Sequence, residues 1–411
     1  MKKHILLLGL LIASLTSCDE ESVGQYPTDN VPPSPVTDVT IKEVFGGGVT
    51  LTYQIPDDID LMGVKAYYTL DTGKKMEVMV SMYEKELNIE GFASAEEHTV
   101  ELRAVDKSRN ESEPTFVKVT PKRAPIFDVF ESLQMFDDFG GIQLKWDNPE
   151  ARDIIVAVSK PIQVDSDIRE GVQNFYSSEK EGIGYVRGFT STLQTFCVEI
   201  SDQWGNKTEM KSQDCLPLYE EEIDGTTYWQ KWNPSDIPYR QYSSSYVITK
   251  LWDGITMYGT KTNNFFHTPA GDPFPVRFTF DMRQVYKLSR FKLYQRGDSW
   301  VYTHGNPKRF VIYGSLSDKV KMDATDPEFQ WIKLGEFESI KPSGLPLGKY
   351  NTEDLEKGSG GEDYTFPIDI ATEVRYIRMD ILETWGGTEM IHISELQMWG
   401  QPEGYSNEQP N

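Results

Sequence analysis

Residues 48–53 read Gly-Val-Thr-Leu-Thr-Tyr, a stretch in which apolar side chains alternate with polar ones. This period of two is typical of a β-strand with one buried face. The pattern returns 93 residues later as Gly-Ile-Gln-Leu-Lys-Trp at residues 141–146. Another alternating stretch, Thr99–Val105, lies between the two copies. The alternation predicts β-sheets that each place one face on a hydrophobic core.

A second pair of matching stretches supports an internal duplication. Asp106–Asn110 and Asp202–Asn206 both begin with Asp and end with Asn, and they lie 96 residues apart. We interpret them as turns in which these side chains bond the backbone between the last two strands, rather than as metal sites. A repeat of domain length without an amphipathic helix predicts two small β-sandwiches, at residues 36–123 and 124–222.

The rest of the chain, residues 232–401, contains longer and more aromatic strands, such as Val276–Asp281 and Arg375–Leu382. Strands and helices do not alternate there, which argues against a parallel nucleotide-binding sheet. The formal net charge of −23 disfavours nucleic acid and anionic lipid as partners. It also argues against an anionic polysaccharide, unless a local basic pocket overrides it. We therefore expect an all-β protein of three tandem sandwiches.

Both inner segments resemble fibronectin type III-like modules, in a β-sandwich class that includes immunoglobulin-like domains. The third segment carries several motifs, in a characteristic order: Leu251–Gly254, Phe265–Thr268, Phe278–Met282, Leu293–Arg296, Asn306–Phe310, Val374–Arg378 and Ile393–Leu396. In order and spacing they resemble the discoidin-like (coagulation factor 5/8 C-type) fold, a galactose-binding-like jelly roll. That fold includes a large family of carbohydrate-binding modules.

The resemblance implies a sugar site at the loop tips. Family members that bind galactose use a His, an Arg and an Asn, and the matching positions here are His267, Arg296 and Asn306. Directed hydrogen bonds from such groups suit vicinal hydroxyls, while an aromatic face packs on the C–H surface of the sugar. The family's ring three residues after the His is Ala270 here. Other rings must therefore supply the stacking: first Trp385, and second Trp300 or Tyr302.

The same resemblance raises the question of a structural calcium ion. Family members often hold one near the Asp-Gly motif, and Asp253 and Glu395 match the ligand positions. Ile255 stands where a second carboxylate usually contributes, although calcium takes six or more oxygen ligands. The alternative is that Asp253 is only a turn residue. No other cofactor is expected.

The start of the chain is similar to a bacterial lipoprotein signal. Lys2 and Lys3 precede an apolar run that ends in Leu-Thr-Ser-Cys at residues 15–18. The resemblance implies that a signal peptide, residues 1–17, is removed and that Cys18 carries the lipid. Residues 18–35, acidic and then rich in proline, would form a tether. Their first acidic residues resemble the export signal of surface lipoproteins, which implies a surface-exposed protein on the outer membrane.

The two other cysteines, Cys197 and Cys215, flank a predicted turn centred on Asn206. A hairpin with this midpoint would place the two thiols nearly opposite each other, and disulfides persist in exported proteins. We therefore hypothesise a Cys197–Cys215 disulfide. The alternative is a pair of buried free thiols.

As a whole, the chain resembles the surface glycan-binding lipoproteins of polysaccharide-utilisation systems in Bacteroidetes. This implies non-catalytic capture of a polysaccharide or oligosaccharide beside a Sus-type transporter, with the lipid as the membrane link. The sequence shows neither a helical zinc-ligand spacing nor a phosphate-binding loop. Two alternatives stay open: an adhesion or assembly lipoprotein that binds a protein partner, and a glycoside hydrolase with a shallow site.

Overall fold

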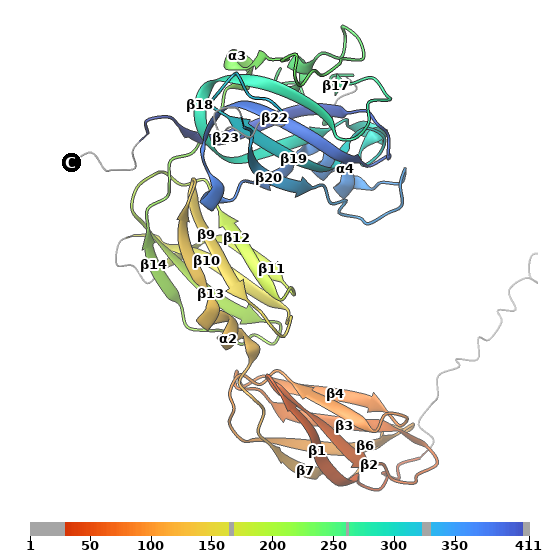
Figure 1. Cartoon of the computed structure of the whole chain (residues 1–411). Helices are drawn as coiled ribbons and strands as arrows, with labels where there is room; N and C mark the ends of the chain where they lie inside the picture. Colours follow the sequence, from red (N-terminus) through yellow and green to blue (C-terminus); the bar gives the residue numbers. More distant parts are fainter. Residues whose placement is uncertain (1–28, 164–167, 260–262, 323–329, 406–411) are drawn as a thin grey trace, which may run out of the picture.

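The computed structural model describes residues 29–163, 168–259, 263–322 and 330–405. They form three β-sandwiches in chain order (Figure 1). The all-β prediction is confirmed. The signal peptide, Cys18 and the first part of the tether lie outside the described residues. Among the residues described, no helix is long and apolar enough to cross a membrane.

The first sandwich packs a three-stranded sheet, in the order β1-β2-β5, on a four-stranded sheet in the order β4-β3-β6-β7. Its strands are β1 (Thr37–Phe45), β2 (Gly48–Gln54), β3 (Leu61–Thr69), β4 (Lys75–Ser81), β5 (Glu86–Glu90), β6 (His98–Asp106) and β7 (Thr115–Val119). The alternation of residues 48–53 produces this core directly, because Val49, Leu51 and Tyr53 all point inward and are buried. This is the predicted fibronectin type III-like arrangement.

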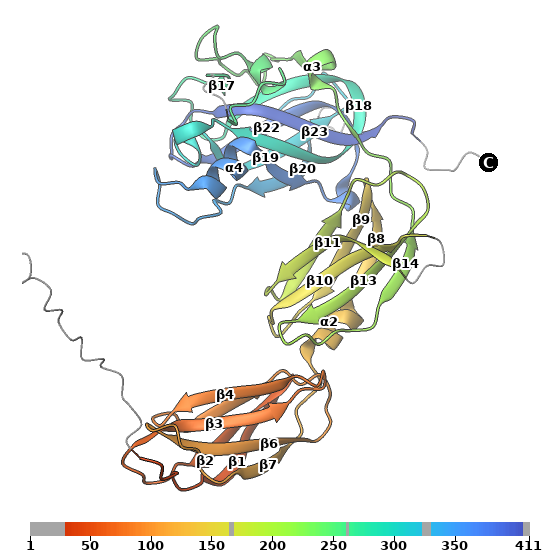
Figure 2. The same ribbon diagram turned by 180° about the vertical axis from the view of Figure 1, so that it is seen from behind.

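The second sandwich repeats the architecture, with sheets in the orders β12-β9-β8 and β11-β10-β13-β14. Its strands are β8 (Gln134–Asp138), β9 (Gly141–Asp147), β10 (Ile154–Pro161), β11 (Arg169–Ser177), β12 (Glu181–Val186), β13 (Gln194–Asp202) and β14 (Lys211–Cys215). One helix, α2 (Pro125–Ser132), was not predicted. Pro125 suits its first turn, where no N–H donor is needed, and Ile126 and Val129 are buried. Figure 2 shows α2 at the end that faces the first sandwich.

The predicted disulfide is wrong, because Cys197 and Cys215 are both free and buried. In the β13–β14 hairpin, Cys197 pairs with Ser212, whereas Cys215 pairs with Gln194. Residues 194 and 197 are three apart on one strand, so their side chains point to opposite faces of the sheet. The thiols therefore cannot meet. Cys215 packs in the sandwich core, and Cys197 contacts Arg169 and Ser212.

The third domain is a jelly roll built around one long strand. Its strands are β15 (Glu221–Glu222), β16 (Gln230–Lys231), β17 (Phe266–His267), β18 (Val276–Gln295), β19 (Pro307–Ser315), β20 (Ile332–Glu338), β21 (Glu362–Thr365), β22 (Glu373–Thr384) and β23 (His392–Pro402). Its helices are α3 (Gly225–Tyr228) and α4 (Thr352–Gly360), with single 3₁₀ turns η1 (Ile248–Leu251), η2 (Asp298–Trp300) and η4 (Ile368–Ile370). β15 already pairs with β23, so the third sheet begins at Glu221, ahead of the predicted start at residue 232.

Strand β18 belongs to both layers of the jelly roll. Residues Val276–Asp281 pair with β22, and Tyr286–Gln295 pair with β23. Between these parts the ladder to β22 is interrupted, and Arg283 adopts a φ of 66°. A residue in this left-handed region bends the strand, so one strand turns the corner between two layers. The aromatic core lies between them, with Phe278, Phe280 and Phe291 among its buried residues.

Candidate functional site

One edge of the third domain gathers all six residues that were predicted to contact sugar. At this edge β18 and β22 end, while β19 and β23 begin. The pairs Pro307–Thr384, Gln295–Ile393 and His267–His392 are neighbours in the sheet. We call the side chains at these strand ends and in their connecting loops the loop edge. The fold thus brings together residues that lie more than one hundred positions apart in the sequence.

Arg296 lies at the centre of the loop edge and is half-buried. Its guanidinium carbon is 3.8 Å from the centroid of the Trp300 ring and 4.4 Å from that of Phe265. The Nε atom is buried without a hydrogen-bond partner. Burial lowers the pKa of Arg296, and among the described residues no carboxylate forms an ion pair with it. The side chain is therefore a cation held by aromatic rings rather than by an acid.

Asn306 holds the loop that carries Trp300. It is fully buried, its Nδ2 donates to the carbonyl of Trp300 at 2.6 Å, and its Oδ1 accepts from the Arg296 backbone at 2.8 Å. Tyr302 is also fully buried. These two predicted sugar-contacting residues thus have no free surface for a ligand in this structure. They position the loop, whereas Arg296, Trp300 and His267 keep accessible surface.

Two histidines that the sequence reasoning did not select complete this region. His392 is 2% exposed, and neither of its ring nitrogens has a hydrogen-bond partner. Burial, then His267 and Arg296, lower its pKa to about 2. His304 packs edge-on against Trp300, with ring centroids 4.5 Å apart. The Nδ1 atom of His267 also lacks a partner, and the ring centroids of His267 and His392 are 4.3 Å apart. The imidazoles are therefore neutral rings clustered near one arginine.

Trp385, the predicted stacking ring, is half-buried on the adjacent loop. Its Nε1 donates to Ser339 Oγ at 3.0 Å. Its ring packs edge-on against that of Tyr302, with ring centroids 5.2 Å apart. Ser339 Oγ in turn donates to Glu362 Oε1 at 2.7 Å. Glu362 is buried, and this burial raises its pKa to about 7. A buried polar network thus fixes one edge of the indole.

Asp253 and Glu395, the predicted calcium ligands, do lie together. Glu395 is 2% exposed; its Oε1 accepts a long bond from the Gly254 backbone, at 3.4 Å, and its Oε2 has no partner among the residues that the structure describes. Burial, then the charge of Asp253, raise the pKa of Glu395 to about 8. Asp253 Oδ1 accepts from Asn264, and its Oδ2 accepts from Lys250 at 3.1 Å. A buried carboxylate oxygen without a donor fits a cation.

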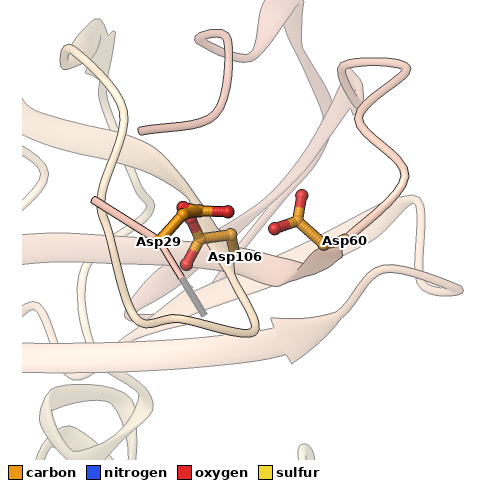
Figure 3. Close-up of side chains that lie close together, drawn as sticks. All are labelled: Asp29, Asp60 and Asp106. Carbon is orange, nitrogen blue, oxygen red and sulfur yellow. The ribbon is translucent and has the colours of Figure 1, made fainter. Parts of the chain in front are cut away.

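A separate acidic cluster lies in the first sandwich, where Asp29, Asp60 and Asp106 approach within 4.8 Å of one another (Figure 3). The predicted turn chemistry explains Asp106: both of its carboxylate oxygens accept from Asn110, each at 2.8 Å. The matching pair Asp202 and Asn206 makes the same two bonds. The position of Asp106 therefore follows from the turn itself.

Models of three protein families match the chain, each described as a domain of unknown function. DUF4959 matches residues 33–121, DUF5126 matches residues 122–226 and DUF5000 matches residues 252–400. No curated protein matches. Among solved structures, a family 32 carbohydrate-binding module from a Clostridium perfringens glycoside hydrolase is 14% identical, with 44% of this chain and 95% of that chain covered and a TM-score of 0.31. A two-domain fibronectin type III segment from chicken tenascin is 17% identical, with 44% and 99% covered and a TM-score of 0.21.

A more similar solved structure is the SusE-like protein BT2857. It is 30% identical, with a TM-score of 0.42, and the alignment covers 68% of this chain and 99% of that chain. The identity thus extends over nearly the whole of that protein. On this sequence relationship, the chain belongs to the family of this SusE-like protein.

Proposed function

We propose that this chain is a non-catalytic carbohydrate-binding protein that captures polysaccharide at the cell surface through the loop edge of its third domain. The observation that carries the proposal is the set of groups around Arg296. Arg296, Trp300 and His267 all keep accessible surface, and among the described residues Arg296 makes no ion pair. Aromatic faces and directed donors are the two components that a sugar site needs. Membership of the SusE-like family supports a role in glycan capture.

The lipid anchor and the transporter partner are further parts of the proposal. A lipid on Cys18 would attach the chain to the outer membrane, facing outward. The two inner sandwiches would then act as a spacer between the membrane and the loop edge. A weak, exposed sugar site would deliver its glycan to a Sus-type transporter. Labelling of intact cells with tritiated palmitate tests the anchor, and a Cys18→Ala variant is expected to lose the label.

The binding test uses affinity electrophoresis of the soluble chain, residues 19–411, in gels that contain a panel of neutral and charged glycans. We expect retardation by at least one polysaccharide. Uniform migration across a broad panel would contradict the proposal. Release of reducing sugar by the pure protein would instead indicate a glycoside hydrolase, and a pull-down partner that sugar does not displace would indicate an adhesion or assembly role.

Trp385→Ala should weaken glycan binding by a factor of ten or more, since loss of a stacking anchor typically costs about 2 kcal/mol. Isothermal titration with the retained glycan measures this change. Trp331→Ala is the matched control, because Trp331 directly precedes β20, whose first residue Ile332 pairs with Gly314 at the opposite end of β19 from Asn306. If Trp385→Ala and the control bound the glycan with equal affinity, Trp385 would not be part of the binding site.

We further propose that Asp253 and Glu395 hold a structural calcium ion, as the unpartnered Glu395 Oε2 suggests. A ligand at 100 times its Kd stabilises a fold by about 2.7 kcal/mol, so calcium should raise the melting temperature by several degrees over EDTA. Glu395→Gln is expected to abolish the calcium-dependent shift, and Glu389→Gln, at an exposed position, should keep it. Identical melting curves in calcium and in EDTA would contradict the proposed calcium site.

A further inference from the structure

Arg296 differs from the other partly buried arginines of the third domain. Arg290, on β18, pairs with Glu220 at 3.0 Å; Arg375 pairs with Asp281 at 2.8 Å; and Arg378 pairs with Asp380 at 2.7 Å. Among the described residues, Arg296 makes no such ion pair, although it is partly buried. In a chain of net charge −23, an arginine that is buried this far without an acid is an uncompensated cation.

The rings around Arg296 limit the direction from which a ligand can approach. Trp300 and Phe265 lie against the guanidinium, and their ring centroids are 3.8 and 4.4 Å from its carbon. A guanidinium that packs against rings keeps its in-plane N–H groups for hydrogen bonding. These donors form a fork that matches two oxygens of one carboxylate or sulfate group. Neutral hydroxyls can also accept from the fork, but they leave the positive charge uncompensated.

The histidines around Arg296 add donors and no negative charge. His392 is 2% exposed with both ring nitrogens unpartnered, and His267 Nδ1 is also unpartnered. The positive charge of Arg296 contributes to the lowered pKa values of His267, His304 and His392. Each neutral imidazole still carries one N–H donor. The unpartnered nitrogens of His392 and His267 are inaccessible, so His267 and His304 border Arg296 with their remaining accessible surface and place no negative charge beside it.

We propose that the loop edge recognises a glycan that carries an anionic group, a carboxylate or a sulfate ester, which binds the guanidinium edge of Arg296 beside His267. This inference rests on the proposed glycan-binding function and specifies the ligand. Arg296 would supply the local positive charge that an anionic glycan needs on an otherwise acidic protein. The acidic protein as a whole repels an anionic glycan. Binding therefore depends on the short-range contact between Arg296 and the anionic group.

The test compares charged glycans with their neutral counterparts on the soluble chain, residues 19–411. The probes are polygalacturonate and its methyl ester, and a sulfated galactan and its desulfated form. Affinity electrophoresis and titration at 0.15 M salt screen charges beyond about 8 Å, which removes most of the long-range repulsion. We expect retention by polygalacturonate, by the sulfated galactan, or by both, and at least tenfold weaker binding of the neutral form. The probe that is retained identifies the anionic group.

Arg296→Gln should weaken binding of the retained anionic glycan by at least tenfold, and Arg296→Lys should weaken it less, because lysine keeps the charge but loses the fork. Arg309→Gln, at an exposed position of β19, is the matched control and should bind like the parent. Near-ultraviolet circular dichroism checks the fold of each variant. Equal retention by the neutral and charged forms would overturn this inference and leave the glycan-binding function standing. Failure of every glycan to bind would overturn both.

Discussion

Replacement of Glu220 by alanine is expected to lower the free energy of unfolding by about 3–5 kcal/mol, the usual cost of breaking a buried ion pair. The Glu220 side chain is 6% exposed and lies where the second domain meets the third. It accepts from Arg187 of the second domain at 3.1 Å. From the third domain it accepts from Arg290 at 3.0 Å and from the buried Ser289 at 2.5 Å.

The large loss of stability is expected because the substitution leaves Arg290 and Arg187 without the carboxylate that they share. Without Glu220, the Arg290 guanidinium keeps its position over the Trp399 ring, at 4.1 Å, but loses its counter-charge. Arg187 retains only Asp138 as an acidic partner, at 3.3 Å. A partly buried cation without its carboxylate is costly, and the loss of a shared partner also frees one domain from the other.

Two measurements check this expectation. Thermal unfolding should show the loss of stability, and limited proteolysis should cut the chain between the second and third domains faster in Glu220→Ala than in the parent chain. Glu222→Ala is the matched control, because Glu222 is exposed on β15 only two residues after Glu220, and we expect a change within about 0.5 kcal/mol. A Glu220→Ala chain that melts and resists protease like the control would show that Glu220 does not join the domains.

The β-sandwich architecture could be predicted because its signals are local. Alternation over residues 48–53 and 141–146 determines which side chains point inward, and Val49, Leu51, Ile142 and Leu144 are fully buried as expected. The disulfide prediction failed for a related reason. It needed the pairing register of β13 and β14, in which Val198 pairs with Lys211, so the hairpin is centred between residues 204 and 205 rather than on Asn206.

The candidate site was predictable in residue type but not in exposure. His267, Arg296 and Trp300 lie on the loop edge with accessible surface, whereas Asn306 turns inward to hold the loop. The direction of the Asn306 side chain depends on the carbonyl of Trp300, which only the folded loop brings within reach. His392 was missed because its role depends on pairing with His267, a contact between residues 125 positions apart.

The pH dependence of stability provides a test of the buried network beneath Trp385. Burial raises the pKa of Glu362 to about 7 from 4.5, so the folded state holds this proton more tightly than the unfolded state. The contribution of Glu362 is therefore most favourable below pH 4.5 and is lost as the pH rises through about 7. A neutral glutamine does not have this dependence. Glu362→Gln should be stabilised relative to the parent by up to ~3 kcal/mol at pH 8 and by almost nothing near pH 4.5.

Groups on several elements face Glu362 and set this behaviour. Gln295 donates to its Oε2 at 3.0 Å and Ser339 to its Oε1 at 2.7 Å, while Tyr302 lies at 3.4 Å and Lys357 is the nearby cation. These donors favour the charged form, but burial outweighs them. Thermal unfolding of both chains between pH 4.5 and 8 at constant ionic strength measures the difference, with Glu356→Gln, at an exposed position of α4, as the control. A constant difference in unfolding free energy between Glu362→Gln and the parent across this range would mean that Glu362 keeps the same protonation state in the folded and unfolded chain.

Ser339 joins Glu362 to the Trp385 indole. A confirmed pH dependence of this difference would therefore also predict that the position of the indole ring responds to pH, which indole fluorescence can follow.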